Sequence, residues 1–169
     1  EKLVPAVDEP RRLLRATRLL LRAAAALGVP VVATTQYAKG LGSIVPEVEE
    51  LLPAGATRLD KTAFSCFDDV TLAETLDAAV KRSRTLLVGG VESHICVAGT
   101  VLEARRRAAT VQVVTDACAA RSAHDHAIGL RRMELAGALP TTAELAVYEM
   151  LVGSGSAAFK AMLPYLKGE

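Results

Sequence analysis

The stretch of residues 85–99 constrains the fold most, because it predicts a buried strand, a tight turn and a helix in succession. A short apolar run leads into Gly89 and Gly90, and Cys96 follows in the first helical turn. Ser93 is the expected N-cap, which makes Cys96 the N3 residue. Unpaired backbone N–H groups and the positive end of the helix dipole favour a thiolate at that position. Cys96 is therefore a candidate reactive cysteine, and the alternative is a small buried hydrophobic residue.

The rest of the chain alternates between expected strands and helices. The expected strands are residues 29–35, 85–90, 111–115 and 138–142. The expected helices are residues 11–27, 71–82, 93–107, 122–136, 143–151 and 156–166, with a loop over 36–42 and a short helical turn over 44–52. This order predicts an α/β fold with three layers, in which helices cover both faces of a doubly wound, mainly parallel sheet.

The length of 169 residues, without a repeat or linker, predicts a single domain over residues 1–169. Four short strands make a thin sheet for so many helices, and the chain opens on a helix. We therefore expect the first strand of the fold to be absent from this chain.

Composition restricts the function classes. Hydrophobic residues make up 51% and aromatic residues 4%, so the core is expected to be aliphatic. A net charge of +1 gives no electrostatic reason to expect binding to nucleic acid or to a membrane. The longest apolar stretch is interrupted by Arg22, Gly28 and Pro30, which argues against a membrane span. An odd count of three cysteines predicts a reduced, cytoplasmic protein without a disulfide framework.

Four motifs occur in order along the chain. They are Thr35-Gln36-Tyr37 with Gly40-Leu41-Gly42, Lys61-Thr62 with Phe64-Ser65, Gly90-Val91-Glu92-Ser93-His94-Ile95-Cys96, and Asp116-Ala117-Cys118 with Arg121-Ser122. Together they resemble the isochorismatase-like cysteine hydrolases, in particular the branch of isochorismatase domain-containing proteins. The resemblance covers most of the chain and implies the doubly wound fold of that family.

The resemblance also implies a catalytic set of an aspartate, a lysine and a nucleophilic cysteine. The lysine corresponds to Lys61 and the cysteine to Cys96. The family aspartate closes the first strand, and no residue of this chain matches it, which leaves either an absent strand or a degenerate member. An oxyanion hole is implied at the backbone N–H groups of Glu92 and Cys96, together with a cis peptide bond between Val91 and Glu92.

By the same resemblance, the expected reaction is hydrolysis of a small amide or related C–N substrate through a thioester. Gln36, Tyr37 and Phe64 are candidate walls of the substrate pocket. The nicotinamidase branch carries an Asp-x-His metal motif, but the comparable loop here, residues 36–39, has no such ligands. We therefore expect no metal, and we also expect no cofactor. Members of the family commonly form dimers or larger assemblies, so we expect a homo-oligomer.

Two other functions are alternatives to hydrolysis. A scaffold or interaction protein that kept the fold is the alternative if the aspartate is truly lost. A nucleotide- or flavin-binding module ranks last, because no glycine-rich phosphate loop opens a helix.

The remaining polar residues of the motifs are expected to play structural parts. His94 is expected to cap a helix or to face solvent. His124 and His126 are expected to point apart and to bind no metal. Asp116 and Arg121 are expected to form a structural ion pair or to clamp a loop, rather than to take part in catalysis.

Overall fold

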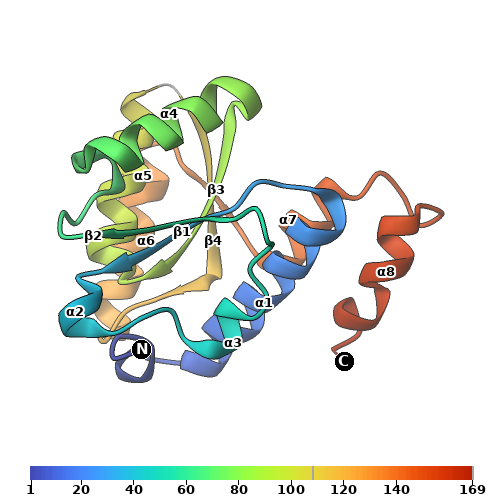
Figure 1. The fold of residues 1–169 in the computed structure, drawn as a ribbon, viewed down its shortest axis with the longest axis horizontal. Coiled ribbons are helices and arrows are strands. Elements are labelled where there is room, and N and C mark those ends of the chain that lie inside the picture. Colours follow the sequence, from blue (N-terminus) through green and yellow to red (C-terminus); the bar gives the residue numbers. More distant parts are fainter. Residues whose placement is uncertain (108, 169) are drawn as a thin grey trace.

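The computed structural model describes residues 1–107 and 109–168 and has the predicted α/β architecture (Figure 1). Its strands are β1 (Val32–Gln36), β2 (Thr57–Lys61), β3 (Thr85–Val91), β4 (Thr110–Ala119) and β5 (Leu139–Thr141). All the strand pairings are parallel, as predicted. Within the described residues the strands form two separate sheets, β1–β2 and β3–β4–β5, rather than one continuous sheet.

Helices connect the strands and cover both faces of the larger sheet. They are α1 (Pro10–Leu27), α2 (Ala38–Leu41), α3 (Pro46–Glu49), α4 (Val70–Ser83), α5 (Ala98–Arg106), α6 (Ala123–Leu135), α7 (Ala143–Met150) and α8 (Ala157–Leu166). Figure 1 shows α5 and α6 on one side of β3 and β4, and α1 and α7 on the other. The three-layer arrangement is therefore confirmed. In the described part of the chain, no helix has both the length and the apolarity needed to cross a membrane.

Strand β4 supplies the centre of the core, because its side chains alternate between the two faces. Val111 and Val113 are buried against α4, α5 and α6, where Val101 and Met133 are fully buried. Val114 points to the opposite face and packs against α1 and α7. The core is aliphatic, as the composition predicts.

Strand β2 was not predicted from the sequence. Its residues, Thr-Arg-Leu-Asp-Lys, contain one apolar side chain, so no hydrophobic run marks them as a strand. The strand exists because it pairs in parallel with β1 along its whole length, from Val32 opposite Thr57 to Gln36 opposite Lys61. Smaller differences are the start of β1, three residues later than expected, and the single turn of α2 inside the predicted loop.

A close approach of two backbones shapes the end of β3. The pairing between β3 and β4 shifts register between Val88 and Gly90. A Cβ atom at Gly89 would lie 3.0 Å from the carbonyl oxygen of Ala117, so only glycine fits there without a shift. Gly90 has a φ of +135°, which also favours glycine. The two glycines thus bring β3 close to β4 just before the turn that carries Cys96.

Candidate active site

The pairing of β1 with β2 brings two polar side chains together at the carboxyl ends of the strands. Gln36 is the last residue of β1 and Lys61 the last residue of β2, and they are directly paired. The carboxyl ends of parallel strands are where α/β sheets bind ligands. Gln36 and Lys61 come from two different motifs and are 25 positions apart in the sequence, and the strand pairing brings them together at one edge of the sheet.

Lys61 is buried, with 4% of its surface exposed. Its ammonium group donates hydrogen bonds to Gln36 Oε1, to the carbonyl oxygen of Ala63 at 2.9 Å and to that of Phe64 at 2.9 Å. Three donors thus meet three acceptors, which compensates for the desolvation of the buried charge. The arrangement fixes a cation at the edge of the sheet.

Cys96 lies next to this cation through the same glutamine. Its Sγ is 3.7 Å from Gln36 Oε1, and Gln36 Nε2 donates to the carbonyl oxygen of Thr62 at 2.8 Å. The amide oxygen of Gln36 therefore accepts from both the lysine and the cysteine. We call this arrangement the Lys61–Gln36–Cys96 line. Gln36 was predicted as a pocket wall, and its link between the two expected catalytic residues was not foreseen.

Cys96 belongs to a π-helical turn, Ser93–Val97, that precedes α5. The prediction that Ser93 caps the helix with its side chain is wrong: Glu92 precedes the turn, and its carbonyl oxygen accepts from the N–H groups of Ile95 and Val97. Ser93 is fully buried, and its Oγ lies 2.9 Å from His126 Nδ1. The peptide bond between Val91 and Glu92 is cis, as the resemblance implies.

The side chain of Glu92 is held by Arg121. The backbone N–H of Arg121 donates to Glu92 Oε2 at 3.0 Å, and its Nε lies 3.0 Å from Oε1 and 3.1 Å from Oε2. Burial alone would raise the pKa of Glu92, but the hydrogen bonds and charge of Arg121 lower it below its ordinary value. The carboxylate stays ionised and anchors the residue that precedes the cysteine turn.

This pairing differs from the predicted ion pair between Asp116 and Arg121. Asp116 Oδ1 instead accepts from the backbone N–H of Ala143, the first residue of α7, at 2.9 Å. The signal for the observed pair lies in the topology: Val91 is opposite Ala119 in the sheet, so the segments that follow both strands emerge together.

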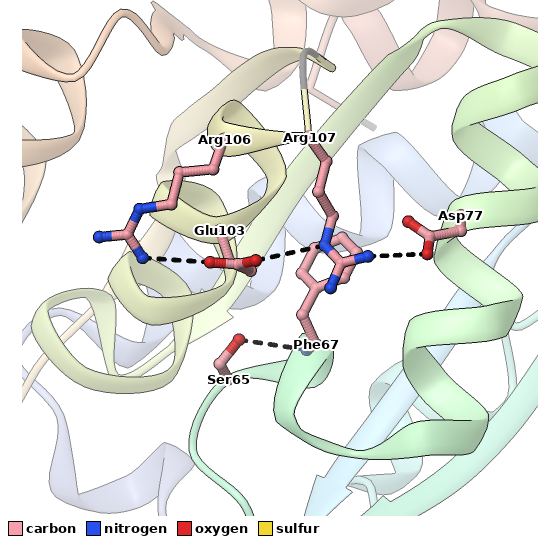
Figure 2. A network of polar contacts seen from close by, with 6 residues as sticks. All are labelled: Ser65, Phe67, Asp77, Glu103, Arg106 and Arg107. Carbon is pink, nitrogen blue, oxygen red and sulfur yellow. Dashed lines mark hydrogen bonds and ion pairs between the residues drawn. The ribbon is translucent and has the colours of Figure 1, made fainter.

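The loop after Lys61 is fastened to α4 and α5 (Figure 2). Ser65 Oγ accepts from the backbone N–H of Phe67 at 3.1 Å, and Cys66 N–H donates to Thr100 Oγ1 at 3.0 Å. Phe67 is buried beneath the guanidinium of Arg107, 4.7 Å from the ring centre.

Arg107 ties the two helices together above that ring. It pairs with Asp77 of α4 at 2.8 Å and with Glu103 of α5 at 3.3 Å, and Glu103 also pairs with Arg106 at 3.1 Å. These contacts hold in place the loop whose carbonyl groups accept from Lys61.

The other predicted pocket residues lie outside the line. Tyr37 is 50% exposed and Phe64 is 64% exposed, so both offer aromatic surface to solvent beside Gln36 and Lys61. His94 Nδ1 is buried and has no hydrogen-bond partner within the described residues, so this atom neither caps a helix nor contacts solvent. Among residues 1–107 and 109–168, no group of three or more His, Cys, Asp or Glu side chains is placed to hold a metal ion.

The three cysteines are free and differ in environment. Cys118 is fully buried, and burial raises the pKa of its thiol to about 12. Cys66 is half-buried and packs against the core beside Phe67. Of the three, Cys96 is the one hydrogen-bonded into the Lys61–Gln36–Cys96 line.

Comparisons with known proteins agree with this architecture. Residues 1–145 match the family model for the Isochorismatase domain. The chain is 35% identical over 149 residues to Isochorismatase domain-containing protein 2 of Macaca fascicularis. The matched region covers 88% of this chain and 69% of the relative.

Solved structures show the same fold. A structure described as MAR1 Ribonuclease from Caenorhabditis elegans superposes with a TM-score of 0.92 at 32% identity, covering 100% of this chain and 85% of that one. The YcaC gene product of Escherichia coli, described as an octameric hydrolase of unknown specificity, gives 0.83 at 23% identity, covering 98% and 85%. The chain belongs to the isochorismatase domain family.

Proposed function

We propose that this protein is a cysteine hydrolase that cleaves a small amide or related C–N substrate through a thioester on Cys96. The observation that carries the proposal is the Lys61–Gln36–Cys96 line, which joins a buried cation to a thiol at the carboxyl edge of the strands. In this arrangement the Cys96 thiol donates to Gln36 Oε1, and we propose that it loses its proton before it attacks the substrate, since the thiolate is the reactive form.

In the first step, the Cys96 thiolate attacks the carbonyl carbon, and the electron pair of the C=O bond moves to oxygen. The backbone N–H groups of Glu92 and Cys96 are the proposed donors to this oxyanion. One such donor lowers a barrier by about 3–4 kcal/mol in acyl transfer. Arg121 supports this arrangement, because it holds the Glu92 side chain and so fixes one of the two donors.

Collapse of the adduct expels the amine, which needs a proton. In the family this proton comes from the aspartate that no residue of this sequence matches. By the resemblance, the proton that the Cys96 thiol loses passes to this aspartate, and the resulting carboxylic acid protonates the leaving nitrogen. The carboxylate then removes a proton from the water that attacks the thioester. Release of the acid product leaves the Cys96 thiolate and the protonated aspartate, and proton transfer between them restores the starting state. In this scheme the buried ammonium of Lys61 stabilises the thiolate, and its three donors stay on their protein acceptors.

The aromatic side chains of Tyr37 and Phe64 are the proposed walls of the substrate pocket, since both are exposed next to residues of the line. The three free cysteines support a reduced, cytoplasmic setting. We propose that the reaction uses no cofactor.

The test is turnover of a panel of small amides, ureides and esters by the wild type and by Cys96→Ala. We expect Cys96→Ala to lower kcat by about a thousandfold or more, because the nucleophile is lost. Cys66→Ala is the matched control and should keep full activity, since Cys66 lies outside the line. Equal turnover by Cys96→Ala and the wild type would overturn the proposal. Failure of the wild type on the whole panel would favour a scaffold protein.

RNA belongs in the same panel, because one structural relative is described as a ribonuclease. We expect no cleavage of a single-stranded RNA, since a net charge of +1 provides no electrostatic footprint for a polyanion.

A further inference from the structure

Two residues of α6 contact the turn that bears Cys96. His126 Nδ1 lies 2.9 Å from the Oγ of Ser93, a side chain with no exposed surface. One turn further along α6, the position of Gly129 faces the next residue of the cysteine turn, His94. His126 and Gly129 are three positions apart and therefore share one face of the helix.

The contact at Gly129 leaves no room for a side chain. A Cβ atom there would lie 2.8 Å from His94 Cα, 3.0 Å from its Cβ and 3.0 Å from its backbone nitrogen. Two of these three atoms are backbone, which cannot turn aside as the tip of a side chain can. Gly129 thus allows α6 to touch the backbone of the cysteine turn directly.

The contact at His126 is a directed hydrogen bond. Burial, together with the positive charge of Arg12, lowers the pKa of His126 below its ordinary value of 6.5, although Asp8 and Glu9 oppose this. This shift favours the neutral ring, whose Nδ1 can accept a hydrogen bond from the Ser93 hydroxyl group.

We propose that the face of α6 formed by His126 and Gly129 positions the nucleophile: it holds Ser93 and His94 so that Cys96 Sγ lies against Gln36 Oε1. His126 is a positioning residue, because it contacts Ser93 rather than the line itself. The inference rests on the proposed function, in which Cys96 is the nucleophile. It adds a residue from a helix that the sequence motifs left without a function.

The experiment measures the rate at which iodoacetamide labels Cys96 at pH 7, with each cysteine peptide followed separately by mass spectrometry. Four variants are compared with the wild type: His126→Ala, His126→Asn, His126→Gln and Gly129→Ala. An asparagine amide can occupy the place of the imidazole Nδ1, whereas a glutamine amide extends one carbon further. Thermal unfolding identifies any variant that does not fold.

We expect His126→Asn to label Cys96 at nearly the wild-type rate. His126→Ala, His126→Gln and Gly129→Ala should label it about tenfold more slowly, because a small displacement takes the thiol out of the line. Rescue by asparagine alone separates positioning from general packing, since His126→Gln retains a polar side chain of similar size.

Two matched controls complete the design. His124→Ala changes an exposed histidine of the same helix, and Gly55→Ala changes a glycine with nothing within 4 Å of the added Cβ. Both should leave labelling unchanged. Wild-type rates in His126→Ala and His126→Gln, or equal slowing in His126→Asn and His126→Ala, would overturn the inference. Turnover on the amide panel tests the proposed function separately, because the labelling ratios need no substrate.

Discussion

Gln36 gives the site its geometry, since one amide oxygen accepts from both Lys61 and Cys96. The sequence motifs identified the lysine and the cysteine as a pair, and they marked Gln36 as a pocket residue. What they could not supply was the contact between Gln36 and Lys61. That contact follows from the pairing of β1 with β2, and β2 gives no strand signal because four of its five residues are polar.

At the residue scale, the ion pair of Glu92 with Arg121 yields a prediction about stability. Arg121→Leu removes the guanidinium group from the buried carboxylate of Glu92 and leaves it the hydrogen bond from the backbone N–H of residue 121. We expect a loss of about 1–3 kcal/mol in the free energy of unfolding at pH 7. The pKa of Glu92 is lowered in the folded state, so the stabilisation is present above the ordinary value of 4.5 and disappears as the pH falls through the folded value.

The difference between Arg121→Leu and the wild type should therefore shrink below pH 4.5, as measured by urea unfolding across the pH range. Arg131→Leu is the control, because Arg131 pairs with Glu134 on the surface, where both side chains are exposed. Arg131→Leu should lower the free energy of unfolding by about 0.5 kcal/mol or less. A loss for Arg121→Leu that is the same at pH 7 and pH 4 would contradict the assignment.

Among the helices and strands, the turn before α5 differs most from the prediction. The pattern predicted one helix over residues 93–107, but the structure divides it into a π-helical turn and α5. Propensity could not reveal this, because His126 and Gly129 of α6 hold the turn from outside. Long-range contacts of this kind are absent from any local pattern.

The loop after Lys61 gives a prediction at this scale. Ser65→Ala removes the acceptor for the Phe67 N–H, and we expect it to lower the free energy of unfolding by about 1 kcal/mol. It should also slow the labelling of Cys96, because the loop carbonyls that hold Lys61 become less fixed.

Ser156→Ala removes an equivalent cap, the acceptor for Phe159 N–H at 3.0 Å, at the start of α8. It should cost similar stability in thermal unfolding and leave Cys96 labelling unchanged. If the two variants affected labelling equally, the proposed link between the loop and the site would be wrong.

At the scale of the whole molecule, the alternation of strands and helices was enough to predict three layers and parallel strands. The division into two sheets was not predictable from the sequence, because it depends on which strands pair, and β2 was unrecognised. The aliphatic core, by contrast, follows from composition, since Val and Ala side chains fill both faces of β4.

We expect a homo-oligomer, because several large apolar side chains are exposed, including Ile128, Leu135 and Leu139. A mainly apolar groove of about 470 Å³ lies between α6 and strands β4 and β5, with Leu130, Met133 and Pro140 in its lining. Light scattering after gel filtration should give a mass that is a multiple of one chain, and a single-chain mass at high protein concentration would contradict this.

We propose that Lys61 makes Cys96 a reactive nucleophile. The most direct measurement is the iodoacetamide labelling rate of Cys96 at pH 7, compared with that of half-buried Cys66 in the same molecule and repeated in Lys61→Met. Fully buried Cys118 serves as the unreactive reference. We predict that Cys96 labels about tenfold faster than Cys66 or more, and that Lys61→Met removes this advantage. Equal rates at Cys96 and Cys66, or a rate at Cys96 that does not depend on Lys61, would contradict the account.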